Sequence, residues 1–184
     1  MRLLSLLLPA LLLTACSAGA AAPADPGVAG VVRTDGLSHD HRSGPLTYDT
    51  SPPVGGVHSP AWLACDAYTT AVPLENAVHS LEHGGIWFAY RPDLPADQVA
   101  RLTAFRDESD ASREYVLVSP YPGLRAPVVA LTWGLSLDVQ DAADPRLQQF
   151  LTTYVGGDQG GEKGAPCRTR GLTPAQAEQL LREG

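Results

Sequence analysis

Methionine is nearly missing from this sequence: among its 184 residues the only one is Met1. A copper site built from methionine thioethers is therefore excluded. Basic residues are also scarce, with 13 Lys and Arg against 20 Asp and Glu and a formal net charge of −7. Because nucleic acids are bound mainly through basic patches, this balance argues against a nucleic-acid partner and against a basic helix lying on a membrane surface.

Motifs of several enzyme classes are missing as well. The chain has no G-x-S-x-G nucleophile motif, no phosphate-binding glycine loop and no G-x-G-x-x-G motif after a strand. Beyond the first apolar segment, no stretch reaches the roughly 20 apolar residues that a membrane-spanning helix needs. The sequence therefore assigns no catalytic residue through these patterns.

The beginning of the chain has the features of an export signal. A positive charge is followed by an apolar run that ends at Ala15 and is too short to span a bilayer. The junction Leu13–Cys16 resembles the bacterial lipobox, in which the peptidase cuts before the cysteine and its sulfur carries a diacylglycerol. Residues 1–15 are predicted to be a signal peptide, and Cys16 a lipidated residue. The alternative is an ordinary signal peptide cut near Ala20 or Ala22.

The residues after Cys16 are mainly small residues, Pro and Gly, which cannot build a core. Residues 16–33 are therefore predicted to be a flexible tether. Residues 34–184 have the length of one globular domain. The expected arrangement is an extracytoplasmic domain attached to the bacterial cell membrane, with membrane lipid as its partner through Cys16 and no protein partner indicated.

Two cysteines remain once Cys16 carries lipid. Outside the cytoplasm, Cys65 and Cys167 are expected to form a disulfide. A closed loop of about 100 residues would stabilise the fold by roughly 4 kcal/mol in the chain-entropy description. The alternative is that one of these thiols is a soft metal ligand.

Apolar periodicity and capping signals predict an α+β domain, or a small α/β domain, with a mixed sheet of three to four strands. An irregular, histidine-rich loop comes first, with at most a short strand at Pro45–Tyr48. The elements expected after it are helix Leu74–His83, strand Ile86–Tyr90, helix Pro95–Ser109, strand Tyr115–Ser119, strand Val128–Trp133, helix Pro145–Val155 and helix Pro174–Arg182. The last two strands are expected to form a hairpin, and residues 156–166 a mobile arm. A thioredoxin-like layout shares this α-β-α-β-β-α order, although no Cys-x-x-Cys is present.

The five histidines all lie between residues 39 and 83. His79 and His83 are one helical turn apart, so both imidazoles face the same way and can hold one ion. His58, in the loop, would complete a site of three histidines, with His41 or a water molecule as the fourth ligand. Such imidazole-rich ligation suits zinc or copper.

Two acidic residues accompany these histidines on the predicted helix. Glu75 and Glu82 lie on the same side as His79, about a third of a turn from the apolar stripe. Either carboxylate would orient an imidazole from outside the ligand set. The alternative to a metal site is structural: His79 would bond a backbone carbonyl, and the charge of His83 would favour the carboxyl end of the helix.

The segment His79–His83 also matches H-x-x-E-H, the inverted zinc-protease motif, in which Glu82 would activate water. A distant Glu supplies the third ligand in such enzymes, and Glu162 is the nominal candidate. The match is weakened because Gly84 and Gly85 end the helix at once, whereas these motifs lie inside long helices.

Several paired motifs resemble a bacterial family known only as domain of unknown function 3105. The motifs are Tyr48–His58 followed by Trp62 and Cys65, Glu75–Gly85, Tyr90–Pro92, Ser119–Leu124, Trp133–Gly134, Phe150 and Gly164–Cys167. The resemblance implies a secreted or membrane-tethered protein and assigns no activity. It also implies that Cys65 pairs with Cys167, and that the family pattern includes His41, His58, His79 and His83 but not His39. Asp66 departs from the glycine that this family has after the first cysteine.

Three functional hypotheses follow. The first is a non-enzymatic lipoprotein that binds a transition metal through His58, His79 and His83, with His41 as a further ligand. The second is a metal-dependent hydrolase that uses the same ligands with Glu82 as the base. The third is a structural or interaction module in which the histidines only join the loop to the helix.

Overall fold

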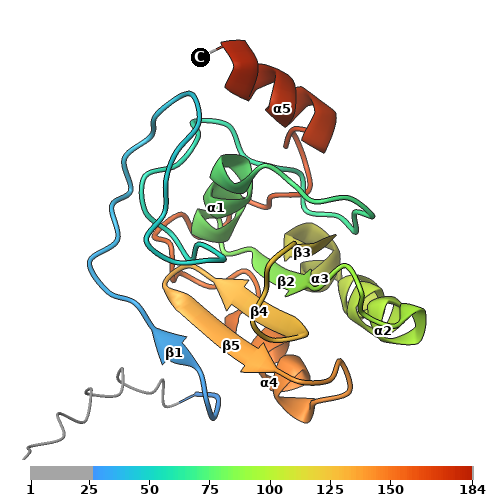
Figure 1. Ribbon diagram of the computed structural model, residues 1–184. Helices are drawn as coiled ribbons and strands as arrows, with labels where there is room; N and C mark the ends of the chain where they lie inside the picture. Colours follow the sequence, from blue (N-terminus) through green and yellow to red (C-terminus); the bar gives the residue numbers. More distant parts are fainter. Residues whose placement is uncertain (1–26, 184) are drawn as a thin grey trace, which may run out of the picture.

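The computed structural model describes residues 27–183. Its elements form layers around one sheet (Figure 1), because the central strands are buried on both faces. In β2 (Ile86–Tyr90) every residue is buried. Phe88 and its neighbours at alternate positions join one apolar cluster, whereas Trp87 and Ala89 join a second cluster on the other face. Because successive side chains of a strand point to opposite faces, a continuous apolar run of this kind requires cover on both sides.

The sheet is mixed and has five strands in the order β1-β5-β4-β2-β3. The other strands are β1 (Val32–Arg33), β3 (Val116–Pro120), β4 (Val128–Thr132) and β5 (Leu135–Val139). β2 is parallel to β3 and antiparallel to β4, while β5 is antiparallel to both β4 and β1. Among the four longer strands, which follow the order β5-β4-β2-β3, only β2 and β3 are parallel neighbours.

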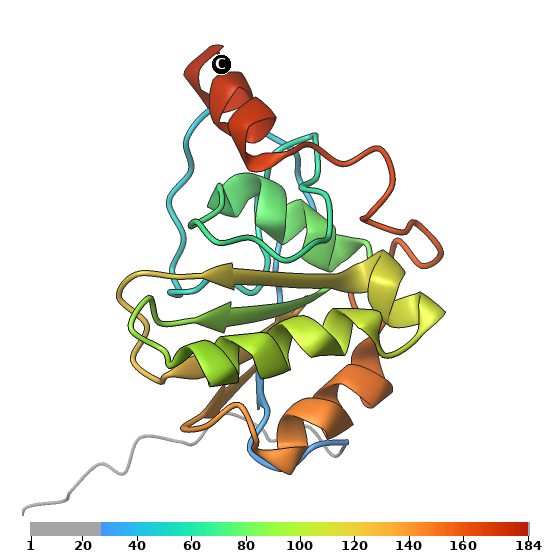
Figure 2. The same ribbon diagram turned by 90° about the vertical axis from the view of Figure 1, so that its right-hand side faces the viewer.

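Helices cover both faces of this sheet, as Figure 2 shows. They are α1 (Leu74–Glu82), α2 (Ala96–Asp107), α3 (Asp110–Tyr115), α4 (Pro145–Tyr154) and α5 (Pro174–Glu183). α1 lies on one face beneath the long N-terminal loop, and α2 and α4 lie on the other (Figure 2). α4 begins as expected, since the Asp144 side chain accepts a hydrogen bond from the Arg146 amide at 2.9 Å. The α+β class and the single mixed sheet are therefore confirmed.

Some element predictions were wrong in detail. β4 pairs with β2 and β5, so the expected hairpin between β3 and β4 does not form. The sheet has five strands, more than the three to four expected, since neither β1 nor β5 was predicted. The helix expected over Pro95–Ser109 ends earlier, and Ser109 instead caps α3 by accepting a hydrogen bond from the Ser112 amide. No strand forms at Pro45–Tyr48.

Part of the segment predicted to be a tether is packed against the domain. Val28 and Val31 are each 2% exposed and join the core cluster formed with α2 and α4. β1 then pairs with the edge of β5 through Arg33 and Leu135. The tether prediction overran because two valines among small residues give no periodic signal, and their burial depends on a partner strand far along the chain. The predicted signal peptide and Cys16 lie outside the described residues.

Cys65 and Cys167 form a disulfide across a sequence separation of 102 residues. Both cysteines are almost fully buried, with 1% and 0% exposure, in the cluster beneath α1. The bond ties the C-terminal arm to the loop that precedes α1. It also removes both thiols from the candidate metal ligands. Within residues 27–183, no helix combines the length and apolar character needed to cross a membrane.

Candidate metal centre

Helix α1 carries the central residues of the site and is covered on all sides. Every residue from Glu75 to Glu82 is buried, so the helix has no solvated face. It ends at Glu82, because Gly84 adopts a φ of +88° and donates its amide to the carbonyl of Leu81. This left-handed turn favours glycine strongly. It leaves His79, Glu82 and His83 in the last turn, each at most 4% exposed.

The N-terminal loop brings two more imidazoles to this turn. His41 and His58 form an isolated parallel bridge, in which the Arg42 amide donates to the His58 carbonyl at 2.7 Å. The loop that follows is fixed to α1 by Asn76, whose side chain donates to Ser59 Oγ at 3.1 Å and to the Ala61 carbonyl at 2.6 Å. Backbone pairing thus sets the positions of His41 and His58.

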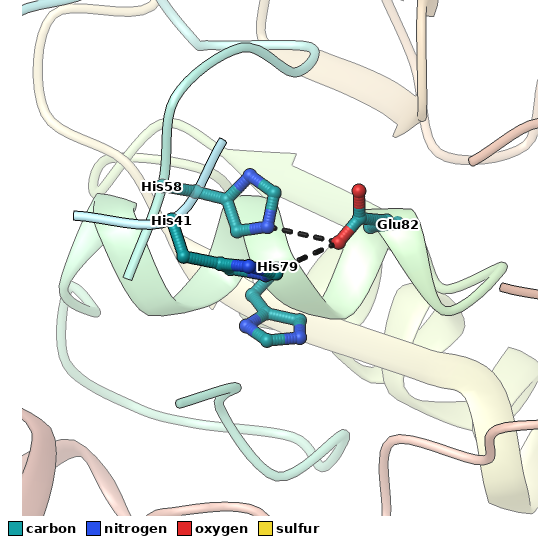
Figure 3. A group of neighbouring side chains, drawn as sticks. All are labelled: His41, His58, His79 and Glu82. Carbon is teal, nitrogen blue, oxygen red and sulfur yellow. Dashed lines mark hydrogen bonds and ion pairs between the residues drawn. The ribbon is translucent and has the colours of Figure 1, made fainter. Parts of the chain in front are cut away.

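Glu82 faces the histidines, and two contacts converge on one of its carboxylate oxygens (Figure 3). Its Oε2 is 2.9 Å from His58 Nε2 and 3.6 Å from His41 Nε2. Its Oε1 is 2.5 Å from His39 Nδ1. The Glu82 side chain is only 2% exposed. A buried carboxylate is costly unless it is paired, so these three imidazoles are its compensation.

Backbone carbonyls orient two of the imidazoles. His58 Nδ1 lies 2.7 Å from the Gly56 carbonyl, and His79 Nδ1 lies 2.7 Å from the Ser59 carbonyl. A carbonyl only accepts, so each Nδ1 carries the proton and each Nε2 keeps a lone pair in the neutral ring. The Nε2 of His58 then faces a carboxylate oxygen of Glu82, and two acceptors in contact require a proton or a cation between them.

The protonation of His79 is also set by its surroundings. The pKa of His79 is lowered to about 4, mainly by burial; the hydrogen bond to the Ser59 carbonyl raises it, and the nearby imidazoles of His58, His83 and His41 lower it. Burial likewise lowers the pKa of His83, while Glu162 and Glu82 raise it. Both rings are therefore neutral at pH 7, which is the form that binds a metal ion.

Two overlapping groups have the composition and spacing of metal ligands. The first is His41, His58, His79 and Glu82, whose ligand atoms all lie within 4.8 Å of one another. The second is His79, His83 and Glu162, within the same limit. Around a tetrahedral zinc ion, neighbouring ligand atoms lie roughly 3.3 Å apart, so only the wider separations in each group would have to shorten for the ligands to close on an ion.

The structure divides the residues predicted from the sequence. It brings together His41, His58 and His79, and it places Glu82, predicted as an orienting residue or as the base of a hydrolase, in the same group of candidate ligands. His83 falls into the second group, with its Nε2 3.0 Å from Glu162 Oε2.

Glu75, the other acidic residue expected to orient an imidazole, contacts the N-terminal loop. Glu75 Oε1 accepts a hydrogen bond from the Leu46 amide at 2.9 Å, so this carboxylate holds the loop.

His39 is the residue that the family resemblance left out. Its ring stacks on Trp133, with centroids 4.6 Å apart, while Nδ1 contacts Glu82. A small surface pocket lined by His39, Trp133 and Gln159 opens beside the cluster. On the opposite side, the Trp62 ring lies 4.8 Å from His83. Trp62 and Trp133 therefore both border the histidine cluster. His39 could have been included in the predicted cluster, because only one residue separates it in the sequence from His41, which was a predicted ligand.

The glycine-rich arm is packed against the site, which its composition did not indicate. A Cβ on Gly160 would lie 2.2 Å from the carbonyl oxygen of Glu82 and 2.4 Å from its Cα. The Gly156 amide donates to the Gly84 carbonyl at 3.0 Å. These glycines permit the backbone of the arm to touch the end of α1, which brings Glu162 to His83.

The fold and this cluster define a histidine–carboxylate centre enclosed in an extended loop and one helix of an α+β domain. The chain belongs to the family described as protein of unknown function (DUF3105), whose family model matches residues 39–169. The matched segment begins at His39 and includes every histidine, Glu82, Glu162 and both disulfide cysteines. No curated protein and no solved structure shows significant similarity to the chain.

Proposed function

We propose that this chain is a non-enzymatic extracytoplasmic lipoprotein that binds one transition-metal ion, zinc or copper, through His41, His58, His79 and Glu82. The observation that carries the proposal is the buried Glu82 carboxylate, which shares one oxygen between two imidazole Nε2 atoms. A metal ion between the carboxylate oxygen and these nitrogen lone pairs supplies the positive charge that holds them together. Three imidazoles and one carboxylate suit zinc or copper.

The surroundings of the cluster support metal binding in a second way. Metal-bound histidines usually donate their other ring N–H to a carbonyl or carboxylate, which fixes the tautomer. His58 and His79 have this arrangement, with the carbonyls of Gly56 and Ser59 as acceptors. Four protein ligands would fill a tetrahedral site, which is typical of storage, transfer or structural sites and not of catalysis.

Metal binding should raise the thermal stability of the protein. The test uses the full exported chain with Cys16→Ser, stripped with EDTA and then melted with zinc, copper or magnesium. At about 100 times the dissociation constant, a bound ion adds roughly 2.7 kcal/mol, which corresponds to a Tm increase of about 5–10 °C. Magnesium is the control, because it prefers oxygen ligands. Equal melting temperatures with zinc, copper and magnesium would contradict the proposal.

The proposed lipid anchor has its own test. Full-length protein in a bacterial host with the lipoprotein pathway should incorporate labelled palmitate and sediment with membranes. Cys16→Ser should lose the label, because the sulfur that carries the lipid is removed. Palmitate label retained by the Cys16→Ser chain, or absent from the parent, would rule the anchor out.

A metal-dependent hydrolase is the second candidate, and one observation favours it. Glu162 reaches His83, so His79, His83 and Glu162 reproduce the ligand set of an H-x-x-E-H zinc enzyme. Against it, both oxygens of Glu82, the required base, already contact histidines. Glu82→Gln distinguishes the two candidates: a hydrolase would keep its metal and lose turnover, whereas the binding protein should lose metal affinity.

A further inference from the structure

We infer that the cluster offers two alternative positions to a single ion, an outer entry position at His83 and Glu162 and an inner position at His41, His58 and Glu82, with His79 as the ligand that both share. The inference rests on the proposed metal binding and adds the route by which the ion arrives. It makes Glu162 and His83 loading residues, a role that no sequence motif assigns to them.

The two positions are alternatives because both need the same ligand, His79. Its Nδ1 donates to the Ser59 carbonyl at 2.7 Å, so only Nε2 has a lone pair to offer. One lone pair binds one ion. In each of the two groups, the ligand atoms lie within 4.8 Å of one another, and His79 is a member of both groups. An ion at either position therefore takes His79 from the other.

The imidazoles surround His79 closely enough for an ion to be exchanged between them. The His79 ring centroid lies 4.8 Å from His41, 4.9 Å from His58 and 4.7 Å from His83. An ion that keeps its bond to His79 can thus leave His83 and Glu162 and meet the inner ligands without crossing open solvent. The inner group has four ligands against three in the outer one, so the ion comes to rest inside.

Each group has one exposed ligand, and their chemistry distinguishes the entry side from the resting side. The Glu162 side chain is 45% exposed and that of His41 is 39% exposed, whereas His58 and Glu82 are 0% and 2% exposed. Of the two exposed ligands only Glu162 is a carboxylate, which attracts a hydrated cation, so the entry position lies on its side. His83 is buried, and its Nδ1 has no hydrogen-bond partner among the described residues. An exposed carboxylate paired with a buried, neutral imidazole forms a weak first contact for a hydrated cation.

The arm that carries Glu162 is held in place by close backbone contact. Gly160 touches the backbone of Glu82 so closely that a methyl group there would overlap it. For Gly157, on the same arm, the three atoms nearest to an added Cβ all belong to the flexible side chain of Gln159. Gly160→Ala should therefore displace Glu162 from His83 without changing either residue, and Gly157→Ala is its matched control.

The experiment measures the rate and the amount of Co(II) taken up by the EDTA-stripped chain, followed by stopped-flow absorption of the bound ion. Glu162→Gln and Gly160→Ala should slow loading by at least about tenfold, since the entry ligand is lost or displaced. The amount bound at equilibrium should change far less than the rate. Asp158→Asn, which removes an equal charge from an exposed position of the same arm, should load at the parent rate.

The outcomes separate this inference from the function on which it rests. Parent-like loading of both Glu162→Gln and Gly160→Ala would overturn the entry position and leave metal binding intact. Complete loss of bound Co(II) in Glu162→Gln would also overturn it, because the ion would then rest at the outer position. If the parent chain itself takes up no Co(II), the proposed function fails and the inference fails with it. Melting curves in EDTA show that each variant is folded.

Discussion

Replacing His41 by alanine should weaken zinc or copper binding by at least about 100-fold, whereas replacing His39 should change it by less than about tenfold. The two residues form a matched pair. They flank Asp40, both contact Glu82, and their side chains are 39% and 53% exposed. Only His41 belongs to the group whose ligand atoms lie together with those of His58 and His79.

The comparison is informative because neither substitution removes a buried side chain. His58→Ala would empty a fully buried position and leave the Gly56 carbonyl without its partner, so lost binding could reflect lost folding. Competition titration with a chromophoric chelator gives the dissociation constants of the parent, His41→Ala and His39→Ala chains. Equal weakening by both substitutions would mean that the histidines act only through the charge of Glu82 and do not ligate an ion.

Loss of the disulfide should lower the free energy of unfolding by about 4 kcal/mol, the value expected from chain entropy for a loop of this length. The double substitution Cys65→Ala and Cys167→Ala tests this by urea denaturation. Alanine is suitable because both positions are almost fully buried in an apolar cluster. The loop closed by the bond spans 102 residues, which includes most of the sheet.

A reductant serves as the control for the disulfide. It should destabilise the parent chain by about the same amount and leave the double variant unchanged. The bond also anchors the arm that carries Glu162, five residues before Cys167 in the sequence. Loading of metal should therefore slow in the double variant even under conditions where it is folded. A loss of stability below about 1 kcal/mol would show that packing, not the cross-link, holds the two segments together.

Local patterns were sufficient to predict the elements that have their own signals. The buried run Ile86–Tyr90 and the helix over Leu74–Glu82, ended by Gly84, appear where they were expected. β5 was missed although Leu135, Leu137 and Val139 alternate with polar residues, which is a strand signal. β1 has two residues only and exists because β5 offers a free edge. No property of its own sequence predicts it.

The histidine site was predicted only in part, because some of its contacts depend on segments that are far apart in the sequence. Helical spacing correctly places His79, Glu82 and His83 in one turn. Whether Glu82 orients a ligand or is one depends on His58, which reaches it through a backbone bridge with His41 and not through sequence spacing. The glycines around Gly160 were interpreted as a sign of mobility, but they permit close contact with α1. Composition alone does not distinguish these two uses of glycine.

The metal content of the protein tests the central claim most directly. The exported chain with Cys16→Ser is purified without chelators and without a histidine tag, beside a His79→Ala variant, and both are measured by elemental analysis. The account predicts about one zinc or copper ion per parent chain and almost none in the variant, because His79 is shared by both positions. No bound metal in either protein, with the variant merely less stable, would contradict the account and leave the histidines a structural role.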